Sequence, residues 1–152
     1  MAAITRASER DVDDVATLFD AYRQFYDQPA DLAAARDFIA SRVSNNESVI
    51  YLARNKSGEA VGFTQLYPSF CSVAARSVWI LYDLFVAPAA RRQGVAVQLM
   101  NRARDHAMET GAAWLKLETA LTNKPAQALY ESLGWVRDDD FYVYYLRPGD
   151  QA

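Results

Sequence analysis

The sequence predicts an α/β fold built on a mixed, mostly antiparallel, twisted sheet with helices on both faces. Three observations carry this prediction. Strand-like segments rich in Val, Ile and aromatic residues come first as a meander, amphipathic helical segments separate them, and strand–helix–strand units follow. No repeat, linker or low-complexity stretch interrupts the chain, so we expect a single domain over residues 1–152.

The first half of the chain contains the meander and two helices. Ser8 caps the first helix, whose opening turn is acidic, and Pro29 begins the second. The predicted elements, in order, are a strand at residues 2–8, helices from Ser8 and from Pro29, and strands at residues 48–54 and 60–70 joined by a hairpin turn.

The second half alternates strands with helices. Pro88 ends a long β-rich run, and Gly111 stops the helix that follows it. The predicted elements are a strand at residues 76–88, a helix at 91–109, a strand at 112–120, a helix at 123–134 and a closing strand at 141–148.

Charge and composition exclude several classes of protein. The net charge of −3 argues against non-specific nucleic-acid binding, which needs a basic face. Cys71 and His106 are the only residues of their types, so neither a disulfide framework nor a clustered His/Cys metal site can form. No signal segment opens the chain, and no apolar run reaches the roughly 18 residues of a membrane span. We therefore expect a cytoplasmic protein with no metal, no nucleic-acid partner and no membrane association.

Residues 91–96, RRQGVA, form a glycine turn between a strand and a helix. The N-terminus of a helix exposes unpaired N–H groups and a partial positive charge, so it suits an anion such as a phosphate. Arg91 and Arg92 would add charge-assisted hydrogen bonds. The turn lacks the further glycines of a dinucleotide-binding fingerprint and the Gly-Lys-Ser/Thr of a P-loop. A solvated basic turn is the alternative interpretation.

A second motif lies at residues 122–135, TNKPAQALYESLGW. Asn123 precedes a short helix, and Tyr130 lies on the apolar face of that helix. The pattern therefore points Tyr130 toward the interior. The alternative is a core tyrosine with no chemical role.

Together the two motifs resemble those of the GNAT superfamily of acetyl-CoA-dependent N-acetyltransferases, nearest to its diamine and histone/polyamine acetyltransferase-like branch. The stretch LFVAPAARRQGVAVQLM is similar to the strand, turn and helix of the family, and TNKPAQALYESLGW is similar to its later helix. Ala96 departs from the glycine that is commoner in the turn. The resemblance implies the acyl-CoA N-acyltransferase fold, in which two central parallel strands splay apart.

The resemblance also implies that acetyl-CoA is the co-substrate. Its pyrophosphate would lie on the glycine turn, its pantetheine arm would run along the splayed strand, and Asn123 would hydrogen-bond that arm. The implied CoA-binding residues are Leu84, Phe85, Val86, Arg91, Arg92, Gln93, Gly94, Val95, Ala96, Asn123, Ala126 and Tyr130.

The chemistry implied by the resemblance is direct acetyl transfer in a ternary complex, without a covalent enzyme intermediate. Tyr130 would protonate the departing thiolate, and the N–H group of Phe85 or Val86 would polarise the acetyl carbonyl. Glu118 is a second candidate for the base or for a substrate contact, with a solvated glutamate as the alternative.

Asp83 is the most unusual residue of its apolar strand, because an unpaired buried carboxylate is costly. The segment YDLFV resembles the Glu-Asp-Phe-Phe-Val segment of the diamine branch, with tyrosine in place of glutamate. The resemblance suggests that Asp83 binds a substrate ammonium or accepts its proton. A structural ion pair with Arg76 or Arg137 is the alternative.

Aromatic residues near the end of the first helix are candidates for the acceptor site. Tyr22, Phe25 and Tyr26 would surround a cation with their ring faces, although packing of the helix would explain them equally. His106 is expected to be half-exposed, without a catalytic role, and three further aromatic residues are expected in the core: Trp79, Tyr82 and Trp135.

We therefore expect an enzyme that N-acetylates a small polyamine- or lysine-like amine. A protein-lysine or N-terminal acetyltransferase is the nearest alternative, and a non-catalytic acyl-CoA sensor on the same fold is another. The segment FYVYYL at residues 141–146 would form an apolar edge strand that can pair with a strand of another chain, which favours a homodimer.

Overall fold

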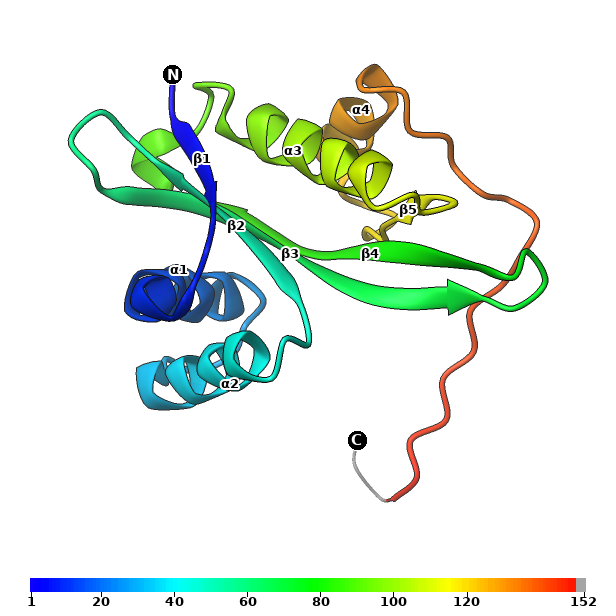
Figure 1. The fold of residues 1–152 in the computed structure, drawn as a ribbon, viewed down its shortest axis with the longest axis horizontal. Coiled ribbons are helices and arrows are strands. Elements are labelled where there is room, and N and C mark those ends of the chain that lie inside the picture. Colours follow the sequence, from blue (N-terminus) through cyan, green and yellow to red (C-terminus); the bar gives the residue numbers. More distant parts are fainter. Residues whose placement is uncertain (150–152) are drawn as a thin grey trace. The chain divides into compact units, whose positions relative to one another are not determined.

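The computed structural model describes residues 1–149 and divides the chain into two compact units, Met1–Leu117 and Glu118–Ala152. The first unit holds a five-stranded sheet with helices on both of its faces (Figure 1). The second unit holds helix α4 (Lys124–Ser132) and the segment that follows it. The predicted α/β fold class is confirmed.

The strands lie in the sheet in the same order as in the sequence. They are β1 (Ala3–Arg6), β2 (Val49–Arg54), β3 (Ala60–Cys71), β4 (Arg76–Val86) and β5 (Leu115–Lys116). The first four strands pair with one another in antiparallel orientation, and β5 is parallel to β4. This parallel pairing ends at Ile80 and Lys116, whereas β4 continues to Val86. The parallel pairing of these two strands is therefore short.

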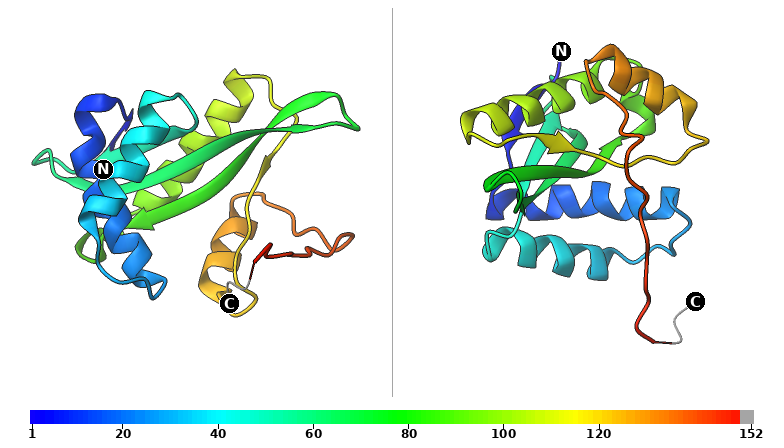
Figure 2. Two further views of the ribbon diagram at one scale, coloured as in Figure 1. Left: turned by 90° about the horizontal axis from the view of Figure 1, so that it is seen from below. Right: turned by 90° about the vertical axis from the view of Figure 1, so that its right-hand side faces the viewer.

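Helices cover both faces of this sheet. Helices α1 (Val12–Phe25) and α2 (Leu32–Ser44) lie side by side on one face, and α3 (Val95–Glu109) lies on the other (Figure 2). The core between α1, α2 and the sheet contains Val15, Ile39, Leu52 and Phe63, all fully buried. The hydrophobic effect of this burial fixes which face of each helix meets the sheet.

Two predicted helix starts are wrong, for local reasons. Helix α2 begins at Leu32 and not at Pro29, because the Asp31 carboxylate caps it by accepting a hydrogen bond from the Ala34 N–H at 3.0 Å. Helix α3 begins at Val95 and not at residue 91, since Arg92 and Gly94 both have the positive φ of the left-handed region.

Two predicted strands also need correction. The strand predicted at residues 112–120 is reduced to β5, Leu115–Lys116. The strand predicted at residues 141–148 is absent from the described part of the chain, and Tyr142, Tyr144 and Leu146 are each 90% exposed. β-branched and aromatic residues favour the extended conformation of a strand. A strand forms only where its backbone N–H and C=O groups pair with those of a second strand.

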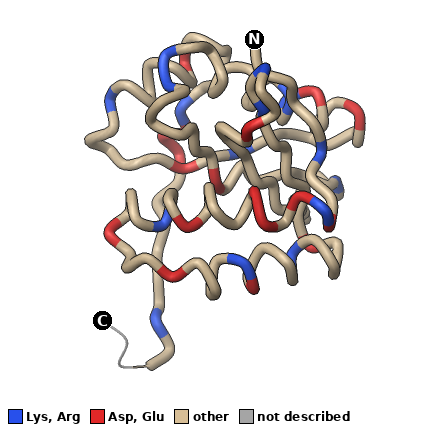
Figure 3. Tube along the Cα trace, turned by 90° about the vertical axis from the view of Figure 1, so that its left-hand side faces the viewer, with Lys and Arg blue, Asp and Glu red and all other residues tan. Residues whose placement is uncertain are grey.

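Charged residues are distributed along the chain without long runs of one sign. Basic and acidic positions are interspersed along the trace in the view of Figure 3. Within residues 1–149, none of the helices combines the length and the apolar character needed to cross a membrane.

Candidate active site

Asp83 lies at the base of a pocket between α1, α2 and the sheet. The carboxylate side chain is only 5% exposed, and the pocket has a volume of about 270 Å³. A β-bulge next to it pairs Gln65 with Asp83 and Leu66 with Leu81, so Tyr82 has no cross-strand partner. The bulge allows the adjacent residues Tyr82 and Asp83 to line the same pocket.

Hydrogen bonds from the neighbouring strand hold the Asp83 carboxylate. Gln65 Nε2 donates to Asp83 Oδ2 at 2.8 Å, and Ser48 Oγ donates to Gln65 Oε1 at 2.7 Å. Gln65 is fully buried and Ser48 is nearly so. None of the ion pairs among residues 1–149 involves Asp83, so neither predicted alternative is present: Arg76 donates to the Gly111 carbonyl and Arg137 pairs with Asp139.

Burial changes the acidity of the groups in this pocket. It raises the pKa of Asp83, although hydrogen bonds from Gln65 and Tyr22 oppose the shift by favouring the carboxylate. It also raises the pKa of Tyr22, and the nearby Asp83 charge adds to that effect. Burial, with a further contribution from Asp83, raises the pKa of Tyr67 to about 12. Both phenols are therefore neutral hydrogen-bond donors at neutral pH, and Asp83 is a stronger base than an exposed aspartate.

The walls of the pocket are mostly aromatic. The ring centroids of Tyr22 and Tyr26 are 5.1 Å apart, and those of Tyr67 and Tyr82 are 5.4 Å apart, both in edge-to-face geometry. Ring faces beside a carboxylate favour a cation. The complete lining is Phe19, Tyr22, Arg23, Tyr26, Gln28, Phe38, Tyr67, Tyr82 and Asp83.

The predicted pantetheine path lies along the same strand. Leu84, Phe85 and Val86 form the end of β4, beyond its pairing with β5. Within residues 1–117, the backbone edge of this segment that continues the β5 side has no partner strand. Such an edge can accept an extended amide-containing chain as an additional strand.

The glycine turn brings unpaired N–H groups to the same end of β4. The first helical hydrogen bond of α3 runs from Gln98 N–H to the Gly94 carbonyl, so the preceding N–H groups of the helix have no partner within it. Gly94 has φ +80°, a conformation that glycine adopts without strain. Gly62 keeps α3 close to the sheet, since a Cβ there would lie 3.0 Å from the Phe85 carbonyl oxygen and 3.2 Å from Val95 Cγ1.

The two arginines of the turn have different surroundings. Arg91 Nε donates to the Val86 carbonyl at 2.9 Å, and its guanidinium lies 5.6 Å from the Phe85 ring centroid and 5.8 Å from that of Phe25. Phe25 therefore contacts Arg91 and is not part of the pocket lining, unlike Tyr22 and Tyr26. Arg92 is exposed.

The remaining predicted site residues belong to the second unit. Asn123 caps α4, its Oδ1 accepting a hydrogen bond from Ala126 N–H at 3.3 Å. Tyr130 is half-buried, with its ring centroid 6.3 Å from that of Trp135, and Glu118 is exposed. That these residues bind CoA together with residues of the first unit stays a prediction.

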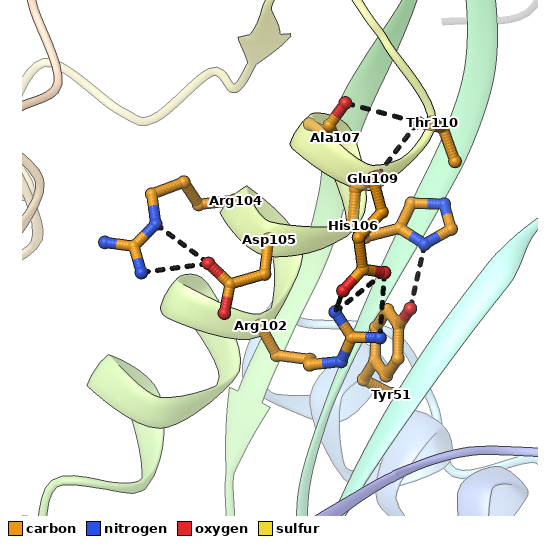
Figure 4. Close-up of polar contacts among 8 residues, drawn as sticks. All are labelled: Tyr51, Arg102, Arg104, Asp105, His106, Ala107, Glu109 and Thr110. Carbon is orange, nitrogen blue, oxygen red and sulfur yellow. Dashed lines mark hydrogen bonds and ion pairs between the residues drawn. The ribbon is translucent and has the colours of Figure 1, made fainter.

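A buried polar cluster joins α3 to the sheet on the face opposite to the pocket. His106 is 5% exposed, so the expectation of a half-exposed histidine is wrong. Its Nδ1 lies 2.8 Å from the Tyr51 hydroxyl, and Arg102 and Glu109 lie beside it (Figure 4). Among residues 1–149, no polar group lies within hydrogen-bond distance of His106 Nε2. This cluster links α3 to β2 through the contact of His106 with Tyr51.

Several pocket residues are absent from the sequence predictions. Tyr67 and Arg23 line the pocket and Gln65 donates a hydrogen bond to Asp83, but no sequence motif singled out any of the three. Tyr82 is 63% exposed at the pocket rim, which corrects its predicted place in the core. Alternation along β3 puts residues 65 and 67 on one face, but only the pairing with β4 brings them to Asp83.

Similarity to known proteins extends along almost the whole chain. Residues 13–135 match the model of the acetyltransferase (GNAT) family. An uncharacterized N-acetyltransferase of Bacillus subtilis, YhfO, is 44% identical over 143 residues, covering 94% of this chain and 95% of that protein. The crystal structure of a probable acetyltransferase superimposes with a TM-score of 0.92 at 41% identity, covering 98% and 99% of the two chains.

A more distant structure shares the fold. An aminoglycoside N-acetyltransferase in complex with CoA superimposes with a TM-score of 0.80 at 18% identity, covering 97% of this chain and 95% of that one. Within residues 1–149, no three His, Cys, Asp or Glu side chains gather as a metal site would require.

Proposed function

Because the chain belongs to the acetyltransferase (GNAT) family, we propose that it transfers the acetyl group of acetyl-CoA to a small primary amine by direct transfer in a ternary complex. The observation that carries the proposal is Asp83, a buried carboxylate without an ion-pair partner in residues 1–149, at the base of an aromatic pocket. The aromatic lining beside this carboxylate supports an amine as the acceptor, and the pocket has a volume of about 270 Å³.

Acetyl-CoA would bind along the end of β4 and the start of α3. The free backbone edge of Leu84–Val86 supports the placement of the pantetheine arm, and the unpaired N–H groups at residues 93–96 support the placement of the pyrophosphate. Arg92 would add charge to the phosphate site, whereas Arg91 would shape the turn through its bond to Val86. The CoA complex of the aminoglycoside N-acetyltransferase supports the co-substrate.

The reaction needs a neutral amine. An alkylamine of pKa about 10.4 is neutral in only about one molecule in 10³ at pH 7. Asp83 would attract the ammonium and accept its proton directly or through water, and its raised pKa suits it to this task. The amine nitrogen then attacks the thioester carbon, and the carbon–sulfur bond breaks.

Two further groups would complete the transfer. The N–H of Phe85 or Val86 would stabilise the oxyanion, and Tyr130 would protonate the departing thiolate. In the second unit, Asn123 and Ala126 would contact the pantetheine arm, and Glu118 is the second candidate for the base.

Thiol release from acetyl-CoA tests this proposal. The purified protein is assayed with spermidine, putrescine, lysine, aminoglycosides and a lysine-rich peptide. We expect turnover of small amines, and a decrease in kcat of about 100-fold in Tyr130→Phe. Tyr142→Phe, at an exposed tyrosine of the same unit, is the matched control. Turnover of the peptide alone would indicate a protein acetyltransferase, and acetyl-CoA binding without turnover of any amine would indicate a sensor.

We also propose that the protein acts in the cytoplasm as a homodimer. The exposed apolar side chains of residues 141–146 support association with a second copy, since such a segment offers unpaired backbone groups to another strand. Size-exclusion chromatography with light scattering measures the mass of the protein in solution. A monomer at micromolar concentration would contradict the proposed dimer.

A further inference from the structure

The pocket contains side chains of both charges, and the proposed function uses only the acidic one. Arg23, in the last turn of α1, lines the same pocket as Asp83 and is half-buried. Asp20, one turn earlier, is engaged by other partners: it accepts hydrogen bonds from Gln24 Nε2 at 3.1 Å and from the Asp31 N–H at 2.9 Å. Among the ion pairs within residues 1–149, none involves Arg23.

Within the described part of the chain, two arginines of the neighbouring helix α2, unlike Arg23, each form an ion pair. Arg36 pairs with Asp13 at 2.6 Å, and Arg42 pairs with Glu47 at 2.9 Å. Their charges are thus neutralised within the protein. Arg23 instead has no ion-pair partner among residues 1–149, and it lines a pocket whose other charged residue is the buried Asp83.

We propose that Arg23 makes the pocket selective for an amine that also carries a carboxylate, and selective against polyamines. This inference rests on the proposed function and names its acceptor class. The substrate ammonium points to Asp83, and its carboxylate is bound by the guanidinium of Arg23. A polyamine would instead place a second ammonium near Arg23, where the like charges repel each other.

The pocket also limits the part of the substrate between its two charges. Phe19, Phe38 and Tyr67 also line the pocket, so an aliphatic chain bound in it would contact aromatic rings. The volume of about 270 Å³ lies near the lower end of the range of small-molecule sites. The acceptor class is therefore a short aliphatic amino acid that is acetylated on its amine.

Three amines of equal chain length test the inference: 6-aminohexanoate, hexylamine and 1,6-diaminohexane. We expect kcat/KM to be highest for 6-aminohexanoate and at least about tenfold lower for the diamine. Arg23→Glu should reverse that order, and Arg23→Gln should bring the two values within a few-fold of each other. Lys56→Glu, an equal charge change in the exposed β2–β3 turn, should keep the wild-type ratio.

Equilibrium binding separates this inference from the proposed function. Calorimetric titration of 6-aminohexanoate and the diamine into the complex of the protein with CoA reports recognition without chemistry. Preferred binding of 6-aminohexanoate that is lost in Arg23→Glu supports the inference, even if no amine is acetylated and the proposed function fails. Equal binding and equal kcat/KM for the two compounds would overturn it, as would a preference that Arg23→Glu leaves unchanged.

Discussion

Asp83 shows at the scale of one residue how a binding group reduces stability. The folded chain holds this carboxylate away from water, where hydrogen bonds from Gln65 and Tyr22 favour its charged form. A buried charge without an ion-pair partner raises the free energy of the folded state. A substrate ammonium would supply the missing counter-charge, so the residue that destabilises the free protein is the one that attracts the ligand.

Replacing this residue separates its two effects. We expect Asp83→Asn to raise the free energy of unfolding by about 1 kcal/mol, a shift in melting temperature of about 2–4 °C, while kcat/KM falls at least about 100-fold. Urea denaturation and the thiol-release assay measure the two quantities. Asp138→Asn, at an exposed position, is the control. A variant less stable than wild type would show that the charge stabilises the fold.

The stability gain of Asp83→Asn should depend on pH. The pKa of Asp83 is raised in the folded state from its ordinary value of 3.8, so the folded chain holds this proton more tightly than the unfolded chain. Stability is therefore lost as pH rises through the raised pKa. The gain should be small near pH 4 and should increase toward pH 8, and urea denaturation across that range measures it. A gain that is constant with pH would contradict the assignment.

His106 should give the opposite pH dependence. Burial, together with the charges of Arg6 and Arg102, lowers the pKa of His106 below 6.5, and Glu109 opposes the shift. The unfolded chain takes up this proton first, so stability is lost as pH falls below about 6.5, by up to about 1.4 kcal/mol per pH unit. Melting temperatures from pH 8 to pH 5 should show a smaller decrease in His106→Gln. Parallel curves for the two proteins would exclude this residue as the cause.

At the scale of elements, the turn between β4 and α3 depends on backbone conformation. Gly94 and Gly58 both have positive φ, at +80° and +83°, and a Cβ on either would meet no atom within 4 Å. We expect Gly94→Ala and Gly58→Ala to lower stability alike, by about 1–2 kcal/mol. Only Gly94→Ala should also weaken acetyl-CoA binding, by about tenfold. Calorimetric titration measures the affinity, and equal affinities in the two variants would remove the turn from the CoA site.

At the scale of the whole molecule, the proposed CoA contacts come from both compact units. Residues 84–86 and 93–96 belong to the first, and Asn123, Ala126 and Tyr130 belong to the second. We therefore expect acetyl-CoA to slow amide hydrogen exchange in β4 and at the start of α3, and also in α4. Hydrogen-exchange mass spectrometry measures this effect with and without ligand. Protection confined to the first unit would overturn the assignments in α4.

The sequence predicted most elements because local chemistry specifies them. Helical spacing of apolar residues located α1 and α3, and the turn segment KSGE at residues 56–59 marked the hairpin between β2 and β3, where Gly58 has a positive φ. The predictions failed where an element depends on partners distant in the chain. The length of β5 and the absence of a strand at residues 141–148 follow from which backbone groups find a neighbouring strand.

By itself, the sequence determined the fold class and the family, since two motifs of fixed spacing carry both. The sequence also singled out Asp83 as a candidate, because a charged residue within an apolar strand can be recognised from the sequence pattern. Only the tertiary structure decided which residues surround that charge. The bulge at Tyr82, the pairing of β3 with β4 and the packing of α1 bring Tyr67 and Arg23 to the pocket and Gln65 to the Asp83 carboxylate. Such groupings depend on register and packing, which are set by contacts between segments far apart in the chain.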